Sequence, residues 1–265
     1  MKYERVIEIF KQIAPMELAE SWDNSGVQIY TGKENIETIM FCLELNDQVI
    51  EEAVEKSVDL IVTHHPLMFN RPDNIDINTV QGRYIIKLIQ EGISLYAAHT
   101  NFDSAPLGNN YYLGKLIGLS NITEVTGDIG ITGELSEAIS YREALGLIKE
   151  RLNLPDHYIK SVGDLDMLVK KVGICTGAGG ELIYSAHDLG CQMVVTGDVK
   201  LNIAQDAKAM GMALVDAGHY GTEIIFAENF IDQFKKIVDE LGEKKVKLVL
   251  AQSNQDPYNS LVDWE

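Results

Sequence analysis

Short apolar segments alternate with longer amphipathic segments along most of the chain. Apolar runs of about four to eight residues are typical of buried strands, and apolar side chains three or four residues apart are typical of helices. Because strands that are separated by helices form parallel β-α-β units, this alternation predicts an α/β fold. The predicted strands are 37–44, 59–63, 93–98, 158–162, 168–175, 192–196, 212–216 and 245–251. The predicted helices are 4–13, 47–57, 79–91, 107–117, 140–152, 180–189, 200–210 and 221–240.

A weak internal repeat predicts two similar lobes. Residues 42–63 and 175–196 each read as a strand, a turn, a helix and an apolar strand that ends in threonine. A chance similarity or a shared β-α-β rhythm is the alternative explanation. We predict two lobes of mixed, largely parallel sheet flanked by helices, with a metal site in the cleft between them. The predicted domains are a first lobe over 1–127, a second lobe over 128–240, and a C-terminal strand and tail over 241–265.

The charge of the chain excludes several classes of partner. The 265 residues include 40 Asp and Glu against 22 Lys and Arg, which gives a formal net charge of −18. Nucleic acids and anionic membranes both attract basic surfaces, so neither is an expected partner. Lys235, Lys236, Lys244, Lys245 and Lys247 are the only candidate lining for a ring around nucleic acid, and a solvated surface is the favoured interpretation.

The chain also has no sign of membrane insertion or secretion. Its longest apolar runs fall far short of the roughly 20 residues of a membrane helix, and its first twelve residues carry charges throughout. Cys42, Cys175 and Cys191 are widely spaced and form no CxxC pair, which is typical of buried thiols in a reducing cytoplasm. We therefore expect a cytoplasmic protein.

Histidines and carboxylates gather directly after three predicted strands, where open α/β folds place their sites. Four of the six histidines lie there, and two carboxylates each follow a histidine by four residues: His64, His65, His99 and His219, with Asp103 and Glu223. A lone histidine at a strand end is usually structural, but this clustering favours a metal site.

Imidazole and carboxylate donors without thiolate suit zinc, iron, manganese, cobalt or nickel. His219 and Glu223 share one face of a helix start and so point toward a single ion. The side chains of His64 and His65 diverge in extended backbone, so that each serves a different ion. Two metals close together activate water and hold an oxyanion.

Other polar motifs have two interpretations each. Trp22 is expected in the hydrophobic core, with stacking on a base or covering the site as the alternative. Asp23 and Asn24 either cap a turn or contact the site directly. Asp198 either belongs to a turn or supports a metal ligand by a hydrogen bond, which we favour, or binds a metal directly. The GAGGE segment (177–181) is either a tight turn, which we favour, or a phosphate cradle without the lysine of such loops.

Four segments together resemble the NIF-three-like family, whose members are dinuclear-metal proteins often labelled GTP cyclohydrolase I type 2 homologues. They are SWDNSGVQI (21–29), VTHHPLMF (62–69), YAAHTNFDSAPLGNN (96–110) and GHYGTE (218–223). The resemblance implies two divalent metal ions held by His64, His65, Asp103, His219 and Glu223, with His99 as a proton-transfer group or a hydrogen-bond partner. It also implies a homohexameric toroid and the short form of the family, which has no inserted domain.

Two functions fit this site. The first is a metal-dependent hydrolase of a small nucleotide-like or phosphorylated substrate, with metal-bound hydroxide as nucleophile. GTP cyclohydrolase-like action is the case that the family label suggests. Two divalent ions with two carboxylates give the site a net positive charge, so we expect a small anionic substrate. The alternative is a metal-binding adaptor or metal-delivery protein without turnover of its own.

Overall fold

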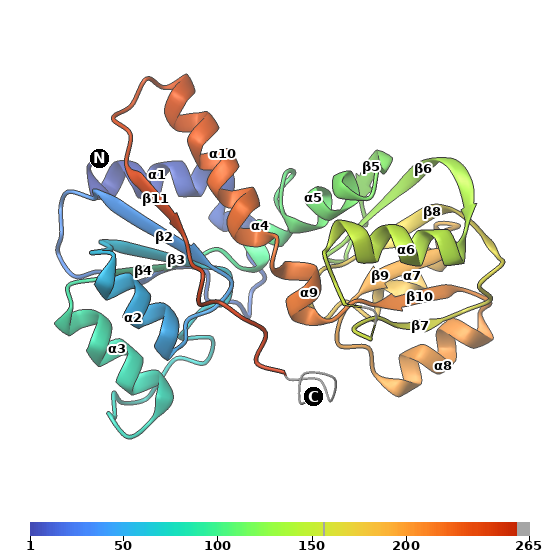
Figure 1. Ribbon diagram of the computed structural model, residues 1–265, viewed down its shortest axis with the longest axis horizontal. Helices are drawn as coiled ribbons and strands as arrows, with labels where there is room; N and C mark the ends of the chain where they lie inside the picture. Colours follow the sequence, from blue (N-terminus) through green and yellow to red (C-terminus); the bar gives the residue numbers. More distant parts are fainter. Residues whose placement is uncertain (156, 259–265) are drawn as a thin grey trace. The chain divides into compact units, whose positions relative to one another are not determined.

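A computed structural model describes residues 1–155 and 157–258 of the chain. It divides into two compact units, of which the first contains 1–102 with 226–265 and the second contains 103–225. The chain therefore leaves the first unit after Phe102 and returns to it at Phe226 (Figure 1). Each unit is built around its own sheet.

The first unit has a five-stranded sheet in the order β1-β4-β3-β2-β11. Only the β1–β4 pair is antiparallel, and the other three neighbouring pairs are parallel. The strands are β1 (Gly26–Ile29), β2 (Thr38–Cys42), β3 (Leu60–Thr63), β4 (Ser94–Ala97) and β11 (Lys247–Leu250). The helices are α1 (Tyr3–Ile13), η1 (Met16–Leu18), α2 (Asp47–Glu55), α3 (Val80–Gln90) and α10 (Phe226–Glu240), and α4 (Thr100–Asp103) ends at the crossing into the second unit.

Helices cover both faces of this sheet, which is why its central strands are buried along their whole length. On one face, Phe10 of α1 packs against Phe41 of β2 and Phe234 of α10. On the other face, α2 and α3 pack against the sheet through a second cluster that includes Ile50, Leu88 and Ile61. The carboxyl ends of β3 and β4 are left for the loops that follow them.

The second unit has a six-stranded sheet in the order β5-β6-β8-β9-β10-β7. Its strands are β5 (Ser120–Glu124), β6 (Ile131–Ser140), β7 (Lys160–Val162), β8 (Leu168–Ile174), β9 (Met193–Thr196) and β10 (Ala213–Asp216). Its helices are α5 (Asn109–Leu116), α6 (Tyr141–Arg151), α7 (Leu182–Asp188), α8 (Leu201–Ala209) and α9 (His219–Glu223). Helices again lie on both faces.

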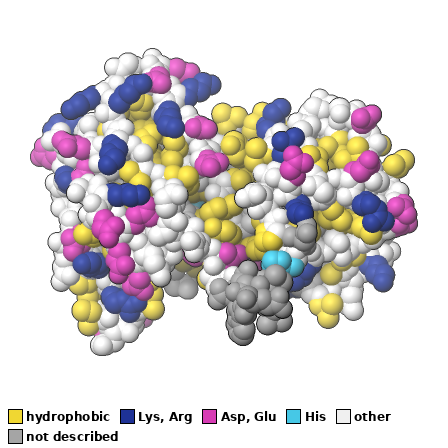
Figure 2. Space-filling model, in the orientation of Figure 1, with side chains coloured by type: hydrophobic (Ala, Val, Ile, Leu, Met, Phe, Trp, Pro, Cys, Tyr) yellow, Lys and Arg dark blue, Asp and Glu magenta, His cyan; other side chains and the backbone are white. Residues whose placement is uncertain are grey.

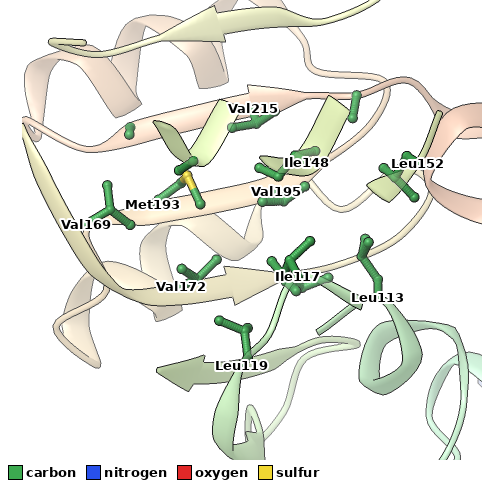
Figure 3. Close-up of a cluster of buried hydrophobic side chains, with 14 of the residues drawn as sticks. Leu113, Ile117, Leu119, Ile148, Leu152, Val169, Val172, Met193, Val195 and Val215 are labelled. Carbon is green, nitrogen blue, oxygen red and sulfur yellow. The ribbon is translucent and has the colours of Figure 1, made fainter. Parts of the chain in front are cut away.

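The core of the second unit forms where α5 and α6 meet the sheet (Figure 3). Leu113 and Ile117 from the α5 region and Ile148 from α6 lie against Val172 of β8 and Val195 of β9 in this cluster. The opposite face packs against α7 and α8 through a separate cluster that includes Leu182, Ile203 and Leu214. The packing holds β9 and β10 in parallel register, Thr196 opposite Asp216.

The mixed α/β architecture predicted from the sequence is confirmed, and the repeat has a structural counterpart. In each unit three consecutive strands run parallel and adjacent, namely β2-β3-β4 and β8-β9-β10, and a short helix follows the third. The second sheet is less parallel than expected, because three of its five neighbouring pairs are antiparallel. Strands β1, β5 and β6 were not predicted.

The unit boundaries also differ from the predicted division at residues 127 and 240. The segment 103–127 belongs to the second unit, because α5 and β5 pack against β6. Helix α10 and β11 return to the first unit, because β11 pairs with β2 and α10 packs against α1. Residues 259–265 of the predicted tail lie outside the described residues.

No helix among the described residues has the length and apolarity needed to cross a membrane. On the face shown in Figure 2, Lys and Arg side chains lie interspersed with Asp and Glu side chains. The three cysteines are free and buried, as predicted.

Candidate metal centre

Three histidines meet at the carboxyl ends of β3 and β4 in the first unit. The parallel register places Thr63 opposite Ala97, so the segments that follow both strands leave the sheet at the same edge. His64, His65 and His99 each offer a ring nitrogen, and these atoms lie within 4.8 Å of one another. We call these three residues the first-unit histidine cluster.

His64 is fully buried and its ring orientation is fixed. Its Nδ1 lies 2.7 Å from the carbonyl oxygen of Ala98, which can only accept a hydrogen bond. The Nδ1 atom therefore carries the proton, and Nε2 is the atom with a lone pair for a metal. The ring also packs against Phe226, with 5.0 Å between centroids.

His65 lies beside the sheet edge with a carboxylate behind it. The backbone N–H groups of His64 and His65 both donate to the carbonyl oxygen of Leu43 at 3.0 Å, which fixes the turn after β3. The Nδ1 atom of His65 lies 3.7 Å from Glu44 Oε2. The Glu44 carboxylate favours a proton on the nearer ring nitrogen, Nδ1, as in His64. The lone pair is then on Nε2, on the far side of the ring.

His99 is held by Asp23, whose carboxylate is fully buried. His99 Nδ1 lies 2.8 Å from Asp23 Oδ1, and the other carboxylate oxygen accepts hydrogen bonds from the hydroxyls of Ser25 and Thr100 at 2.7 and 2.6 Å. Burial by itself would raise the pKa of Asp23, but the hydrogen bonds from His99, Thr100 and Ser25 outweigh it and hold the pKa well below its usual range. Asp23 is thus an anionic partner of the imidazole rather than only a turn cap.

In the second unit, His219 and Glu223 lie side by side at α9. His219 Nε2 lies 3.0 Å from Glu223 Oε2, as expected for two residues one helical turn apart. On its other side, His219 Nδ1 lies 2.7 Å from Asp198 Oδ2. Asp198 lies in a turn with a φ of 52° and contacts the histidine from behind, as the sequence predicted for this turn. We call His219 and Glu223 the second-unit pair.

The glycine-rich segment 177–181 makes room for this pair. A Cβ atom on Gly177 would lie 2.2 Å from Glu223 Oε1 and 3.2 Å from His219 Nε2, and Gly177 has a φ of 68°. The amide of Gly177 donates to Thr222 Oγ1, and that of Gly179 donates to Thr196 Oγ1. These N–H groups therefore bind side chains of the protein, which supports the turn rather than the phosphate cradle.

Asp103 lies at the end of α4 and is oriented by two buried asparagines. Asn109 Nδ2 donates to Asp103 Oδ1 at 3.2 Å, and Asn110 Nδ2 donates to the Asp103 carbonyl oxygen at the same distance. Asn110 Oδ1 in turn accepts the amide hydrogen of Thr176 at the end of β8. These contacts fix the direction of the Asp103 carboxylate within the second unit.

The sequence matches the family model of Duf34/NIF3 (NGG1p interacting factor 3) over residues 1–257. The chain belongs to this family. A Clostridium perfringens protein named GTP cyclohydrolase 1 type 2 homolog is 33% identical over 265 residues, covering 97% of this chain and 99% of that protein. The crystal structure of a Staphylococcus aureus hypothetical protein has a TM-score of 0.90 and 27% identity, covering 98% of this chain and 99% of that one.

Members of the Duf34/NIF3 family differ in length, and this chain has the short form. The alignment with the C. perfringens protein extends over 265 residues, which equals the length of this chain. A Listeria monocytogenes relative, also named GTP cyclohydrolase 1 type 2 homolog, is 24% identical over 363 positions, covering 94% of this chain and 96% of that protein. That relative therefore contains a long stretch without a counterpart here.

The predicted donors lie in both units, and several of their hydrogen-bond partners were not predicted from the sequence. The structure brings together His64, His65 and His99 in one unit, and His219 with Glu223 in the other. No pattern in the sequence indicated that Glu44, Thr100 and Asn109 would contact the predicted donors. That all five predicted ligands bind the same pair of ions stays a prediction.

Trp22 was expected in the core, and this was wrong. The residue is 56% exposed, because it lies in a loop before the edge strand β1 rather than in a buried element. Its ring lies 6.2 Å from that of His99 and 5.8 Å from that of Phe69, between centroids. The alternative interpretation, a ring beside the site, agrees with this position.

Proposed function

We propose that this Duf34/NIF3 member binds two divalent metal ions and hydrolyses a small nucleotide-like or phosphorylated substrate. The proposed ligands are the five that the family resemblance implies: His64, His65, Asp103, His219 and Glu223. Zinc, iron, manganese, cobalt and nickel all suit this donor set, which has no thiolate. His99 acts beside the metals as the proton-transfer group.

One observation carries the metal proposal. Asp198 fixes the proton of His219 on Nδ1, so that a neutral ring turns the Nε2 lone pair toward Glu223 Oε2, 3.0 Å away. A lone pair and a carboxylate oxygen at that distance repel each other unless a proton or a metal ion lies with them. Two ligand atoms that each lie about 2.0–2.2 Å from one metal ion are themselves roughly 3 Å apart, which matches this separation. A metal ion bound by both atoms would also stabilise the Glu223 carboxylate, whose side chain is only 4% exposed.

The chain leaves and re-enters the first unit close to the first-unit histidine cluster. Phe102 and Phe226, where the chain leaves and re-enters the first unit, pack edge-to-face with 5.3 Å between centroids. Phe226 also packs against His64. Asp103 directly follows Phe102, and Glu223 lies three residues before Phe226. Both carboxylates are therefore tethered within a few residues of a ring pair that contacts the first-unit histidine cluster.

The residues of the chain divide the chemistry between them. Divalent metals in such a site acidify water and hold oxygen atoms of the substrate. His99 keeps its Nδ1 proton on Asp23, so its Nε2 accepts a proton from the attacking group and returns it to the leaving group. Asp23 stabilises the imidazolium that forms in between, since its carboxylate is buried and stays ionised. The surplus of positive charge over two carboxylates favours an anionic substrate.

We also propose a cytoplasmic homohexamer arranged as a toroid. The three free, buried cysteines agree with a reducing compartment. The family resemblance supports the hexamer, and light scattering coupled to size-exclusion chromatography would measure it directly. A monomer across a wide concentration range would contradict the hexamer.

The test combines metal analysis with a substrate panel. The purified chain is reloaded with each candidate metal and assayed on nucleoside triphosphates, including GTP, and on phosphoesters. We expect about two metal ions per chain and turnover of at least one compound class. The variant His64→Ala/Asp103→Ala should lose both, whereas the matched variant His187→Ala/Asp188→Ala, on α7, should keep both.

Equal turnover by the parent chain and the His64→Ala/Asp103→Ala variant would contradict the hydrolase. Stoichiometric metal without turnover of any compound would instead indicate the metal-binding adaptor. Rapid transfer of that metal to a competing chelator would indicate a delivery protein.

A further inference from the structure

Two exposed aromatic rings flank His99 in the first unit. Trp22 is 56% exposed and Phe69 is 47% exposed. Their ring centroids lie 5.8 Å apart, and the His99 ring lies 6.2 Å from the first and 6.0 Å from the second. The three rings therefore form one aromatic surface, of which His99 also borders His64 and His65.

The loops that carry the two rings are bound tightly to each other. Asn24 Nδ2 donates to the carbonyl oxygen of Met68 at 2.7 Å, and the Met68 amide donates to Gln28 Oε1 at 3.1 Å. Gln28 Nε2 donates back to the carbonyl oxygen of Asn24 at 2.6 Å. These bonds involve residues next to Phe69 and two positions after Trp22, so they fix the backbones from which both rings project.

The same loop is fixed to His99 on its other side. Asp23, which directly follows Trp22, binds His99 Nδ1 and the Thr100 hydroxyl. The Glu20 amide also donates to Thr100 Oγ1 at 3.0 Å. Hydrogen bonds of Glu20 and Asp23, on either side of Trp22 in the chain, thus fix the Trp22 backbone relative to His99 and Thr100.

We propose that Trp22 and Phe69 bind a flat heteroaromatic ring of the substrate and place it against His99. The planes of the two rings differ by 56°, so neither covers the other, and their exposed surface is free for a third ring. Stacking on aromatic side chains binds any base through its π face. Rings that project from fixed loops bind with a smaller entropy loss than rings on mobile loops. This inference rests on the proposed function, whose substrate it defines as a ring-containing anion rather than a simple phosphoester.

The test compares ligands with and without a ring. The full chain, loaded with manganese, is titrated by calorimetry with the four common ribonucleoside monophosphates and with ribose 5-phosphate. Stacking is worth roughly 1–3 kcal/mol per base, so Trp22→Leu should weaken binding of at least one nucleotide by about fivefold or more. Binding of ribose 5-phosphate and the metal content should not change.

Two further variants separate ring contact from loop damage. Trp22→Phe keeps an aromatic face and should retain most of the affinity, whereas Phe69→Leu should lose affinity as Trp22→Leu does. Tyr184→Leu removes an aromatic residue on α7 in the second unit that is 40% exposed, and it should bind as the parent chain does.

Several outcomes would overturn the inference. One is nucleotide affinity that Trp22→Leu and Phe69→Leu leave unchanged, and another is a parent chain that binds no nucleotide. A change of oligomeric state in Trp22→Leu would assign the rings to an interface between copies of this chain. A chain that binds no metal but loses nucleotide affinity in Trp22→Leu would contradict the proposed function and leave the ring site standing.

Discussion

His219 donates a hydrogen bond from Nδ1 to Asp198, and Asp198 corresponds to His65 in the internal repeat, because both repeated segments and these two residues are offset by 175 − 42 = 133 positions. Where the first unit has a second histidine, the second unit has a carboxylate that fixes its histidine from behind. The two halves of the repeat thus share strands and turns but differ in chemistry. The first unit supplies mainly imidazoles, and the second supplies one imidazole with carboxylates.

This relationship predicts the effect of Asp198→Asn on metal binding. The amide can offer N–H to His219 Nδ1, which would move the ring proton to Nε2 and block the nitrogen that faces Glu223. Loss of such a partner typically weakens metal binding by about 10–100-fold. Competition with a fluorescent chelator would measure it. Asp206→Asn, at an exposed position on α8, should bind metal as the parent chain does, and equal affinity in both variants would contradict the role of Asp198.

Asp23→Asn should behave differently, because its partner His99 is the proposed proton-transfer group and not one of the proposed ligands. We expect two metal ions to remain bound while kcat falls by about 10–100-fold, as the imidazolium loses its buried counter-ion. Metal analysis and steady-state kinetics on the same preparation would separate the two effects. Loss of metal in parallel with kcat would instead make His99 a ligand.

Much of the fold follows from local patterns. The buried strands LIVT (60–63) and MVVT (193–196) are continuous apolar runs. Because parallel strands end at one edge of a sheet, the donors that follow β3 and β4 could be expected to lie together. Strand β5 could not be predicted in this way, because it is a largely exposed edge strand that carries no apolar run. Its pairing with β6 is a tertiary contact.

The candidate site could likewise be predicted only in part. Histidines and carboxylates after strands are visible in the sequence, but the orientation of each ring depends on distant partners. Ala98 acts on His64 through its backbone oxygen, which leaves no trace in the sequence. The exposure of Trp22 was missed because a large aromatic residue is usually buried, and only the neighbouring loop around Met68 explains its position.

Gly177→Ala should remove metal binding by the second-unit pair. The new Cβ atom would lie 2.2 Å from Glu223 Oε1, so the carboxylate must move away from His219. We expect metal affinity to fall at least as much as in Asp198→Asn, with a loss of thermal stability. Gly211→Ala is the matched control, since Gly211 has a similar φ of 73° but open space around its Cβ position. If both variants lose metal equally, backbone strain and not the Glu223 contact is responsible.

Glu52 gives a prediction that is independent of the metals. It accepts hydrogen bonds from the Gln252 and Ser253 amides, at 3.0 and 2.9 Å to Oε2, and from the Ser253 hydroxyl, and it pairs with Lys56. Burial alone would raise the pKa of Glu52, but the bonds from Lys56, Ser253 and Gln252 outweigh it and lower the pKa from 4.5 to about 2. Glu52→Gln should therefore reduce the free energy of unfolding at pH 7 by about 1–3 kcal/mol.

The pH dependence of this effect has a definite sign. Because the folded-state pKa of Glu52 is lowered, its contribution is complete above pH 4.5 and is lost as the pH falls toward 2. Urea unfolding of the parent chain and Glu52→Gln should differ at pH 7 and converge at low pH. The exposed Glu55→Gln, on the same helix, should show no such difference. If the difference in free energy of unfolding between the parent chain and Glu52→Gln stays constant down to pH 3, the ionised Glu52 carboxylate is not the source of the stabilisation.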